Sequence, residues 1–174
     1  MLAVQVDGSE TGFVADMNAE AHALGMNHTT YTDPSGFDPS AVSTAADQLR
    51  IFEQAIQVPI FRQLVSMPSV TLPVAGALTN FDPLVTDGYA GKTGSDSAAK
   101  GCLAFFTQVT VGDQAMTAVG VVLGQGQGSN TTVLLAAAAQ AAKRLVGSVV
   151  PAIPSSEEAS SPPHLPSAAH RLRR

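Results

Sequence analysis

The sequence predicts an α+β fold, in which helices come first, an antiparallel sheet follows, and a last helix packs against that sheet. Two apolar, β-rich runs, 102–111 and 115–123, are joined by Val111-Gly-Asp-Gln114, which is typical of an antiparallel hairpin. An alanine-rich segment at 131–147 follows and is expected to be helical. The 174 residues are 45% apolar and 13% charged, so one domain with a hydrophobic core is expected.

The first predicted helix covers residues 10–24, and Gly25 is placed to end it. Its apolar residues recur at helical spacing, and they are Phe13, Val14, Met17, Ala21 and Leu24. Residues 26–42 contain two Asp-Pro pairs and a Ser-Gly pair, which predict a loop with tight turns. Within this loop Asp33 and Asp38 are expected to be turn residues.

A second helix is predicted at 43–57, because either Ser43 or Thr44 can cap it and Asp47 lies one turn in. This helix is expected to stop near Pro59, and a short helix at 60–66 follows it.

Residues 69–91 are predicted to be extended and irregular, because they contain two prolines and several glycines. Three strands are then expected, at about 89–96, 102–111 and 115–123, in one antiparallel sheet. The strands are apolar at nearly every position, which predicts cover on both faces of the sheet. The last helix is expected to end with Lys143 and Arg144 near its negative end and with Gly147 past it.

Charge and composition exclude several classes of function. The formal net charge is −5, so no nucleic acid partner is expected. No apolar run approaches 18 residues, which predicts no transmembrane segment, and Met1–Asp7 lacks the features of a signal peptide. The domain organisation expected is one folded unit at 1–150 and a disordered tail at 151–174, which is rich in proline and serine.

The most informative motif is Lys92-Thr93-Gly94, a K-T-G triplet within the run Asp87-Gly-Tyr-Ala-Gly-Lys-Thr-Gly-Ser95. With it, the chain resembles the serine-type D-alanyl-D-alanine carboxypeptidases, the low-molecular-mass penicillin-binding proteins. Four further blocks match that family in order over about residues 8–147: Phe13-Val-Ala-Asp-Met-Asn18, Ala23-Leu-Gly-Met26, Asp33-Pro-Ser-Gly-Phe37 and Ser43-Thr-Ala-Ala-Asp47.

The resemblance implies the C-terminal part of a β-lactamase-like, penicillin-binding transpeptidase fold. It implies that Lys92 and Thr93 hold the terminal carboxylate of a peptidoglycan stem peptide or a β-lactam. Gly94 would leave room for the ligand, and the Ser95 backbone N–H would supply half of an oxyanion hole. The family implies no cofactor and no metal. It places the activity outside the cytoplasmic membrane, whereas a chain expressed as given would be cytoplasmic.

The resemblance implies a mechanism with three motifs: S-x-x-K supplies the acylated serine and its lysine base, S-x-N lines the cleft, and K-T-G forms the other wall. Only K-T-G is found here in its expected place, so the resemblance implies that 1–150 is part of a catalytic domain and not the whole of it. No S-x-N occurs, and the single formal S-x-x-K, Ser97-Ala-Ala-Lys100, lies where a hairpin turn is expected. No catalytic residue is therefore assigned, and the chain alone is not expected to hydrolyse D-Ala-D-Ala. Three explanations remain open: a start annotated too late, a truncated copy with weak ligand binding at most, and a split protein whose partner chain supplies the first half.

Other motifs favour structural roles. Gly124-Gln-Gly-Gln-Gly-Ser129 has its third glycine at 128, where a dinucleotide site requires it at 129, and it lacks the acidic residue of such a site, so it predicts a turn into the last helix. The four histidines have no metal-ligand spacing. Cys102, the one cysteine, is expected to be a small buried residue of a strand.

Overall fold

The structure is a computed structural model that describes residues 2–153, and it confirms the α+β prediction. Five α-helices, five strands and two 3₁₀ turns occur in the described residues. In chain order they are α1 Leu2–Asp7, α2 Glu10–Ala23, α3 Ala45–Ala55, α4 Pro59–Val65, β1 Ser69–Leu72, β2 Gly76–Thr79, η1 Val85–Asp87, β3 Tyr89–Asp96, β4 Lys100–Val111, β5 Gln114–Gln125, α5 Thr131–Val149 and η2 Val150–Ala152.

The helix ends follow the capping chemistry of the sequence. Thr44, not Ser43, caps α3, because its hydroxyl accepts a hydrogen bond of 3.1 Å from the Asp47 backbone N–H. Gly25 follows the end of α2 with φ of 69°, a conformation that glycine adopts without strain. Pro59 is the first residue of α4, where its missing N–H costs nothing.

The main sheet has the order β3-β4-β5, and both pairs are antiparallel as predicted. Lys92 pairs with Ala104 and Gly94 with Cys102, so the K-T-G triplet lies on β3. Because β4 is central and β5 closes one side, β3 is an edge strand of this sheet.

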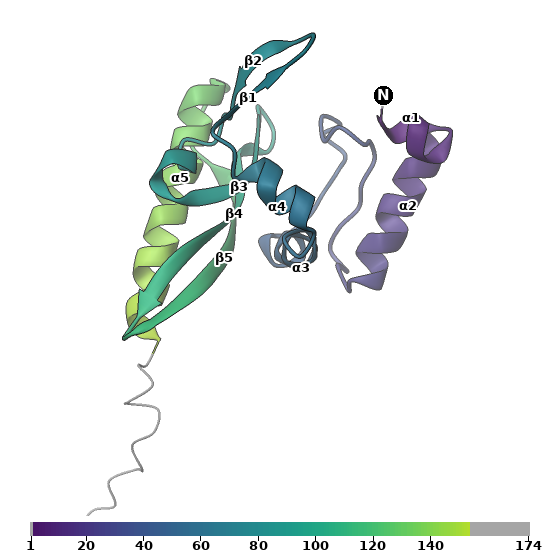
Figure 1. Ribbon diagram of the computed structural model, residues 1–174. Coiled ribbons are helices and arrows are strands. Elements are labelled where there is room, and N and C mark those ends of the chain that lie inside the picture. The colour runs from purple at the N-terminus through teal and green to yellow at the C-terminus, as the bar shows by residue number, and fades with distance from the viewer. Residues whose placement is uncertain (1, 154–174) are drawn as a thin grey trace, which may run out of the picture.

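Both faces of the sheet are covered, which confirms that prediction. Helix α5 packs on one face, while α3 and α4 pack on the other (Figure 1). On the α5 face, Leu103 and Phe105 pack against the buried alanines of that helix. On the opposite face, Phe52 of α3 lies in one cluster with Ala90 and Phe106. Each burial of such a side chain contributes roughly 1.5–3 kcal/mol of hydrophobic free energy.

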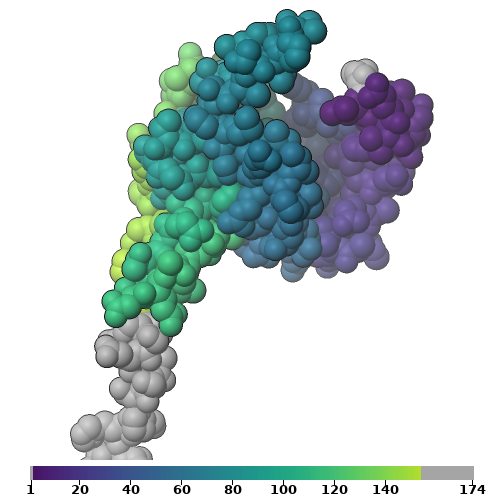
Figure 2. Space-filling view, viewed as in Figure 1, coloured from purple at the N-terminus to yellow at the C-terminus, as the bar shows by residue number. Residues whose placement is uncertain are grey.

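Helices α1 and α2 lie beyond α3 and α4, on the side away from the sheet (Figure 2). Residues 24–44 connect α2 to α3 and run back between them, pinned by a bridge between Thr30 and Val42. The loop prediction for 26–42 is therefore confirmed.

The structure corrects three sequence predictions. Residues 69–91 are not merely irregular, because β1 and β2 form a second, two-stranded antiparallel sheet. Helix α1 was not predicted. Gly147 lies inside α5 and not past its end.

Helix α5 also bears on the membrane prediction. Residues Thr131–Ala152 are long and apolar enough to cross a membrane by length and composition, although polar residues such as Gln140 and Lys143 interrupt the apolar stretch. In the structure one side of α5 is buried against the sheet through Leu134, Ala138 and Ala142. Most of the tail predicted at 151–174 lies outside the described residues, and the part that is described begins with the 3₁₀ turn η2.

Candidate functional site

The candidate site is centred on the edge strand β3. Lys92 is exposed, and its Nζ donates a hydrogen bond to the carbonyl oxygen of Thr93. The ion pairs among residues 2–153 are Arg50–Asp47 and Lys143–Asp87, so no carboxylate neutralises Lys92 there. An unpaired ammonium group beside an open strand edge can attract and hold an anionic ligand.

A large hollow opens over this edge, with a volume of about 970 Å³. One wall is β3 from Lys92 to Asp96, and the facing wall comes from the loop between α2 and α3. Phe81, the beginning of α5 and residues of β4 and β5 also contribute to the lining. This volume is at the upper end of the range for small-molecule sites, which is about 300–1,000 Å³.

A second, smaller hollow of about 300 Å³ lies between α3 and the sheet. It shares Lys92, Thr93 and Gly94 with the large hollow, and its other side chains are mostly apolar. They include Ile51, Phe52, Ala55, Phe61, Leu103, Ala104, Val121 and Leu123. The triplet therefore lies where a polar rim meets an apolar recess.

Gly94 leaves the hollow open at the triplet. A Cβ added to Gly94 would approach only the Cys102 Cβ, at 3.7 Å, an ordinary van der Waals distance. Gly91, three residues earlier, is different, because a Cβ there would clash with the backbone of β4 and lie 3.0 Å from the Phe105 Cα. Gly91 is therefore required by packing, whereas nothing in the packing requires Gly94.

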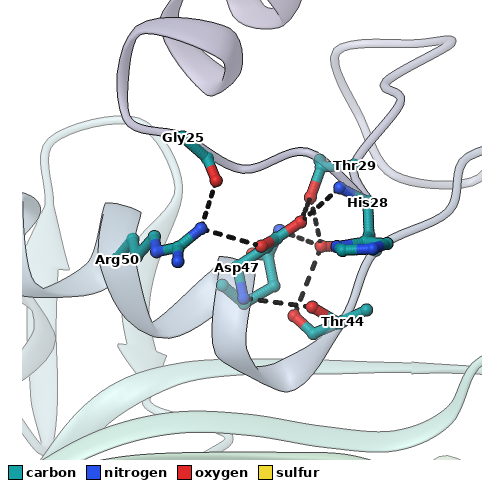
Figure 3. A network of polar contacts seen from close by, with 8 residues as sticks. Gly25, His28, Thr29, Thr44, Asp47 and Arg50 are labelled. Atoms are coloured by element: carbon teal, nitrogen blue, oxygen red, sulfur yellow. Dashed lines mark hydrogen bonds and ion pairs between the residues drawn. The ribbon is translucent and has the colours of Figure 1, made fainter.

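The facing wall is fixed by Asp47, which is only 2% exposed (Figure 3). Its Oδ2 accepts hydrogen bonds from the His28 backbone N–H at 2.8 Å and the Thr29 hydroxyl at 2.9 Å. Arg50 donates both to Asp47 and to the Gly25 carbonyl oxygen. Burial alone would raise the pKa of Asp47, but the hydrogen bonds from His28 and Thr29 and the nearby positive charges hold it below its ordinary value.

Asp33 orders the part of this wall that lines the hollow. Its carboxylate accepts hydrogen bonds from four successive backbone N–H groups, those of Ser35, Gly36, Phe37 and Asp38, at 3.1–3.4 Å. The hydrogen bond from the Ser35 hydroxyl is the largest cause that lowers the pKa of Asp33. The predicted turn roles of Asp33 and Asp38 are confirmed, since Asp38 accepts from the Ser40 backbone N–H.

The formal S-x-x-K forms the turn between β3 and β4, as predicted. Lys100 Nζ donates to the backbone carbonyl oxygens of Ser97, at 2.6 Å, and Gly128, at 3.1 Å. Neither Ser97 nor Lys100 lines either hollow. The Gly124–Ser129 run begins in the last two residues of β5 and then bends into α5, whose N-cap is Asn130.

Lys92, Thr93, Gly94 and Ser95 all line the large hollow. They are consecutive residues of one strand, so the fold necessarily keeps them together. Cys102 was expected to be a buried strand residue, but it is half-buried and lines both hollows. Burial raises the pKa of its thiol. Within residues 2–153, no three His, Cys, Asp or Glu side chains are grouped as metal ligands.

Phe37 and Phe81 also line the large hollow, although neither was predicted as a site residue. Phe37 is the last residue of a matched block, Asp33-Pro-Ser-Gly-Phe37, and that match was the available signal. Phe81 carried no signal, because its place in the lining depends on the path of residues 80–88.

Comparison with known proteins identifies relatives for this chain. The family model for D-alanyl-D-alanine carboxypeptidase matches residues 1–127. The chain is 41% identical over 71 residues to a D-alanyl-D-alanine endopeptidase of Pseudomonas aeruginosa, which covers 41% of this chain and 23% of the relative. It is 37% identical over 102 residues to the D-alanyl-D-alanine carboxypeptidase DacB2 of Mycobacterium tuberculosis, covering 53% and 35%.

Solved structures agree. Penicillin-binding protein D2 of Listeria monocytogenes in its cefotaxime-bound form superposes with a TM-score of 0.68 at 26% identity, over 84% of this chain and 57% of that one. A penicillin-binding protein homologue of Mycobacterium tuberculosis, described as evolved, gives a TM-score of 0.60 at 30% identity, covering 82% and 57%. The chain thus spans little more than half of these structures and about a quarter to two fifths of its curated relatives.

Proposed function

Because the chain belongs to the D-alanyl-D-alanine carboxypeptidase family, we propose that its β3 edge binds the terminal carboxylate of a peptidoglycan stem peptide or a β-lactam. The observation that carries the proposal is Lys92, a cation with no ion-pair partner among residues 2–153, on an edge strand that opens into a hollow large enough for such a ligand. The family places this chemistry outside the cytoplasmic membrane, and we propose the same location for the assembled site.

Each residue of the triplet region has a proposed role. Lys92 supplies the positive charge, and the Thr93 hydroxyl donates a hydrogen bond to the same carboxylate. Gly94 admits the ligand, since the space over it is open. The Ser95 backbone N–H donates to the carbonyl oxygen of the bond to be cleaved. An extended peptide beside β3 would add main-chain hydrogen bonds along the strand edge.

Turnover requires groups that this sequence does not contain. In the serine route, a serine oxygen attacks the carbonyl carbon, the terminal D-Ala leaves, and water then releases the acyl group. The nucleophile and its base come from S-x-x-K, and the only such sequence here forms a turn outside the hollows. We therefore propose that these 174 residues bind the ligand without hydrolysing it.

Calorimetry with diacetyl-Lys-D-Ala-D-Ala and with its C-terminal amide tests the binding role. The free acid should bind more tightly than the amide, and Lys92→Gln should remove that preference. Lys143→Gln is a matched control, since Lys143 is already paired with Asp87 at 2.7 Å. Equal binding of acid and amide by the wild-type chain would contradict the proposal, as would release of D-Ala by the pure chain.

A second candidate is one half of a two-part enzyme. The apolar recess between α3 and the sheet favours it, because open apolar linings usually receive a partner surface. This recess lies directly beside Lys92, where a polypeptide carrying S-x-x-K and S-x-N would have to reach. Covalent labelling by a fluorescent penicillin of a co-expressed pair, but of neither part alone, would support this candidate.

The domain boundary also remains a proposal. Residues 1–150 are proposed to act as the family domain, and 151–174 as an appended tail. Removal of residues 154–174 should leave the binding preference for the free acid unchanged.

A further inference from the structure

Two exposed phenylalanines line the large hollow. The chain has seven phenylalanines, and all seven lie in the described residues. Five of them are buried or half-buried, whereas Phe37 is 78% exposed and Phe81 is 79% exposed. Both exposed rings belong to the lining of the hollow that contains Lys92. The exposure of large aromatic side chains is thus concentrated at one place.

Both rings project from turns that hydrogen bonds hold in shape. The backbone N–H of Phe37 is one of the four that the Asp33 carboxylate accepts. Phe81 lies between Asn80 and Asp82, which form a linked pair of turns. Asn80 Oδ1 accepts from the Asp82 backbone N–H, and Asp82 Oδ1 accepts from the Leu84 backbone N–H, each at 2.9 Å. The Asn80 amide also donates to the Met67 carbonyl oxygen at 3.0 Å.

A rigid turn that presents an exposed phenyl ring is suited to binding. Because each ring is exposed, it adds little hydrophobic free energy to folding. That free energy is gained only when a bound ligand buries the ring. Little conformational entropy is lost, since the turn is already ordered. The same hollow holds the Lys92 ammonium group, so one ligand can contact both the cation and the rings.

We propose that Phe37 and Phe81 form an apolar subsite for an aromatic or long aliphatic group on a ligand whose carboxylate is held by Lys92. This inference rests on the proposed function, and it adds a preference within the same hollow. The chain should therefore select carboxylate ligands that carry such a group at the end away from the carboxylate.

A matched pair of penicillins separates this subsite from carboxylate binding. Benzylpenicillin and 6-acetamidopenicillanate share the ring system, the carboxylate and the amide, and they differ by one phenyl group. Equilibrium binding to the full chain should favour benzylpenicillin about tenfold, the effect of covering one phenyl ring. Phe37→Ala and Phe81→Ala should each reduce this ratio and leave the affinity for 6-acetamidopenicillanate unchanged.

Three controls make the outcomes distinct. Phe37→Leu keeps an apolar side chain and should retain part of the ratio. Val74→Ala removes an apolar side chain that is 99% exposed and outside the hollow, and it should change nothing. Lys92→Gln should weaken both penicillins alike. Thermal melts check that each variant folds as the wild type does.

The inference is overturned if both penicillins bind with the same affinity, or if both phenylalanine variants keep the wild-type ratio. In that case loss of binding in Lys92→Gln would still support the proposed function. If neither penicillin binds, or if both bind independently of Lys92, the proposed function fails and the subsite fails with it.

Discussion

Gly91 and Gly94 lie three residues apart on β3, yet the structure predicts opposite effects of adding a methyl group. At Gly91 a Cβ would clash with the Ala104 carbonyl oxygen, and it would lie 3.0 Å from the Phe105 Cα and 3.1 Å from the Ala104 carbonyl carbon. These are backbone atoms of β4, so they cannot turn aside as a flexible side chain does. At Gly94 the nearest atom is the Cys102 Cβ at 3.7 Å.

The expected magnitudes follow from these contacts. Overpacking of this kind costs about 1–3 kcal/mol, so Gly91→Ala should lower the melting temperature by roughly 2–12 °C for a chain of this length. Gly94 has an ordinary negative-φ backbone, so Gly94→Ala should leave the fold intact or stabilise it by about 0.4–1 kcal/mol through the unfolded state. The added methyl group would instead occupy ligand space, and binding of the free-acid peptide should weaken about tenfold.

Circular dichroism melts and calorimetry on both variants test this pair. The reasoning is refuted if Gly91→Ala has the same melting temperature as the wild type, because β3 and β4 would then not approach each other as closely as the structure shows. It is also refuted if Gly94→Ala binds the peptide as tightly as the wild type, since the ligand would then not lie over Gly94.

Further predictions concern stability. Asp82 is 2% exposed, its Oδ2 has no hydrogen-bond partner among the described residues, and burial raises its pKa above the ordinary value of 3.8. An acid with a raised folded pKa destabilises the fold as pH rises, so the stability of Asp82→Asn relative to wild type should increase from pH 4 to pH 7 in urea unfolding series; a constant difference would contradict this. Thr44→Ala should lose about 1 kcal/mol of unfolding free energy in the same assay, while Thr44→Ser should lose little, because only the serine keeps the cap of α3. Asp47→Asn should shift the acid unfolding midpoint to higher pH relative to wild type, because the wild-type carboxylate has a lowered pKa and stabilises the fold while it is ionised, a contribution that asparagine lacks; an unchanged midpoint would exclude Asp47 as a contributor to acid unfolding.

Local chemistry explains which elements could be predicted from the sequence. Helix α2 and helix α3 are bounded by residues with specific end chemistry, Gly25 and Thr44, and both helices were predicted within a few residues. The choice between Ser43 and Thr44 could not be made, because both side chains can cap and only the backbone geometry decides. The sheet was predicted because β4 and β5 are long, apolar and joined by a short turn.

The missed elements lack such signals. Strands β1 and β2 have four residues each and are mostly exposed, so little hydrophobic patterning marks them. Helix α1 has only six residues, and its contact with α2, not its own propensity, accounts for it. Two substitution-sensitive glycines, Gly91 and Gly120, were also invisible, since their need for glycine arises from contacts with β4.

Some residues of the candidate site could likewise be predicted from the sequence, and others could not. The triplet could be found because Lys92, Thr93 and Gly94 are adjacent in the chain and carry a family motif. The two phenylalanines of the lining could not, because Phe37 and Phe81 come from separate segments and reach the hollow only through the fold. The exposure of Cys102 to the hollow likewise depends on its pairing with Gly94, a residue without a side chain to cover it.

The chain contains one cysteine, and that cysteine lines the hollow beside the triplet, so its reactivity reports directly on the site. The measurement is the rate of Cys102 alkylation by iodoacetamide with saturating diacetyl-Lys-D-Ala-D-Ala and with its C-terminal amide. If the β3 edge holds the carboxylate, the free acid should slow alkylation more than the amide does, and Lys92→Gln should abolish the difference. Equal rates with acid, with amide and without peptide, at concentrations where calorimetry shows binding, would place the ligand elsewhere and contradict the central claim.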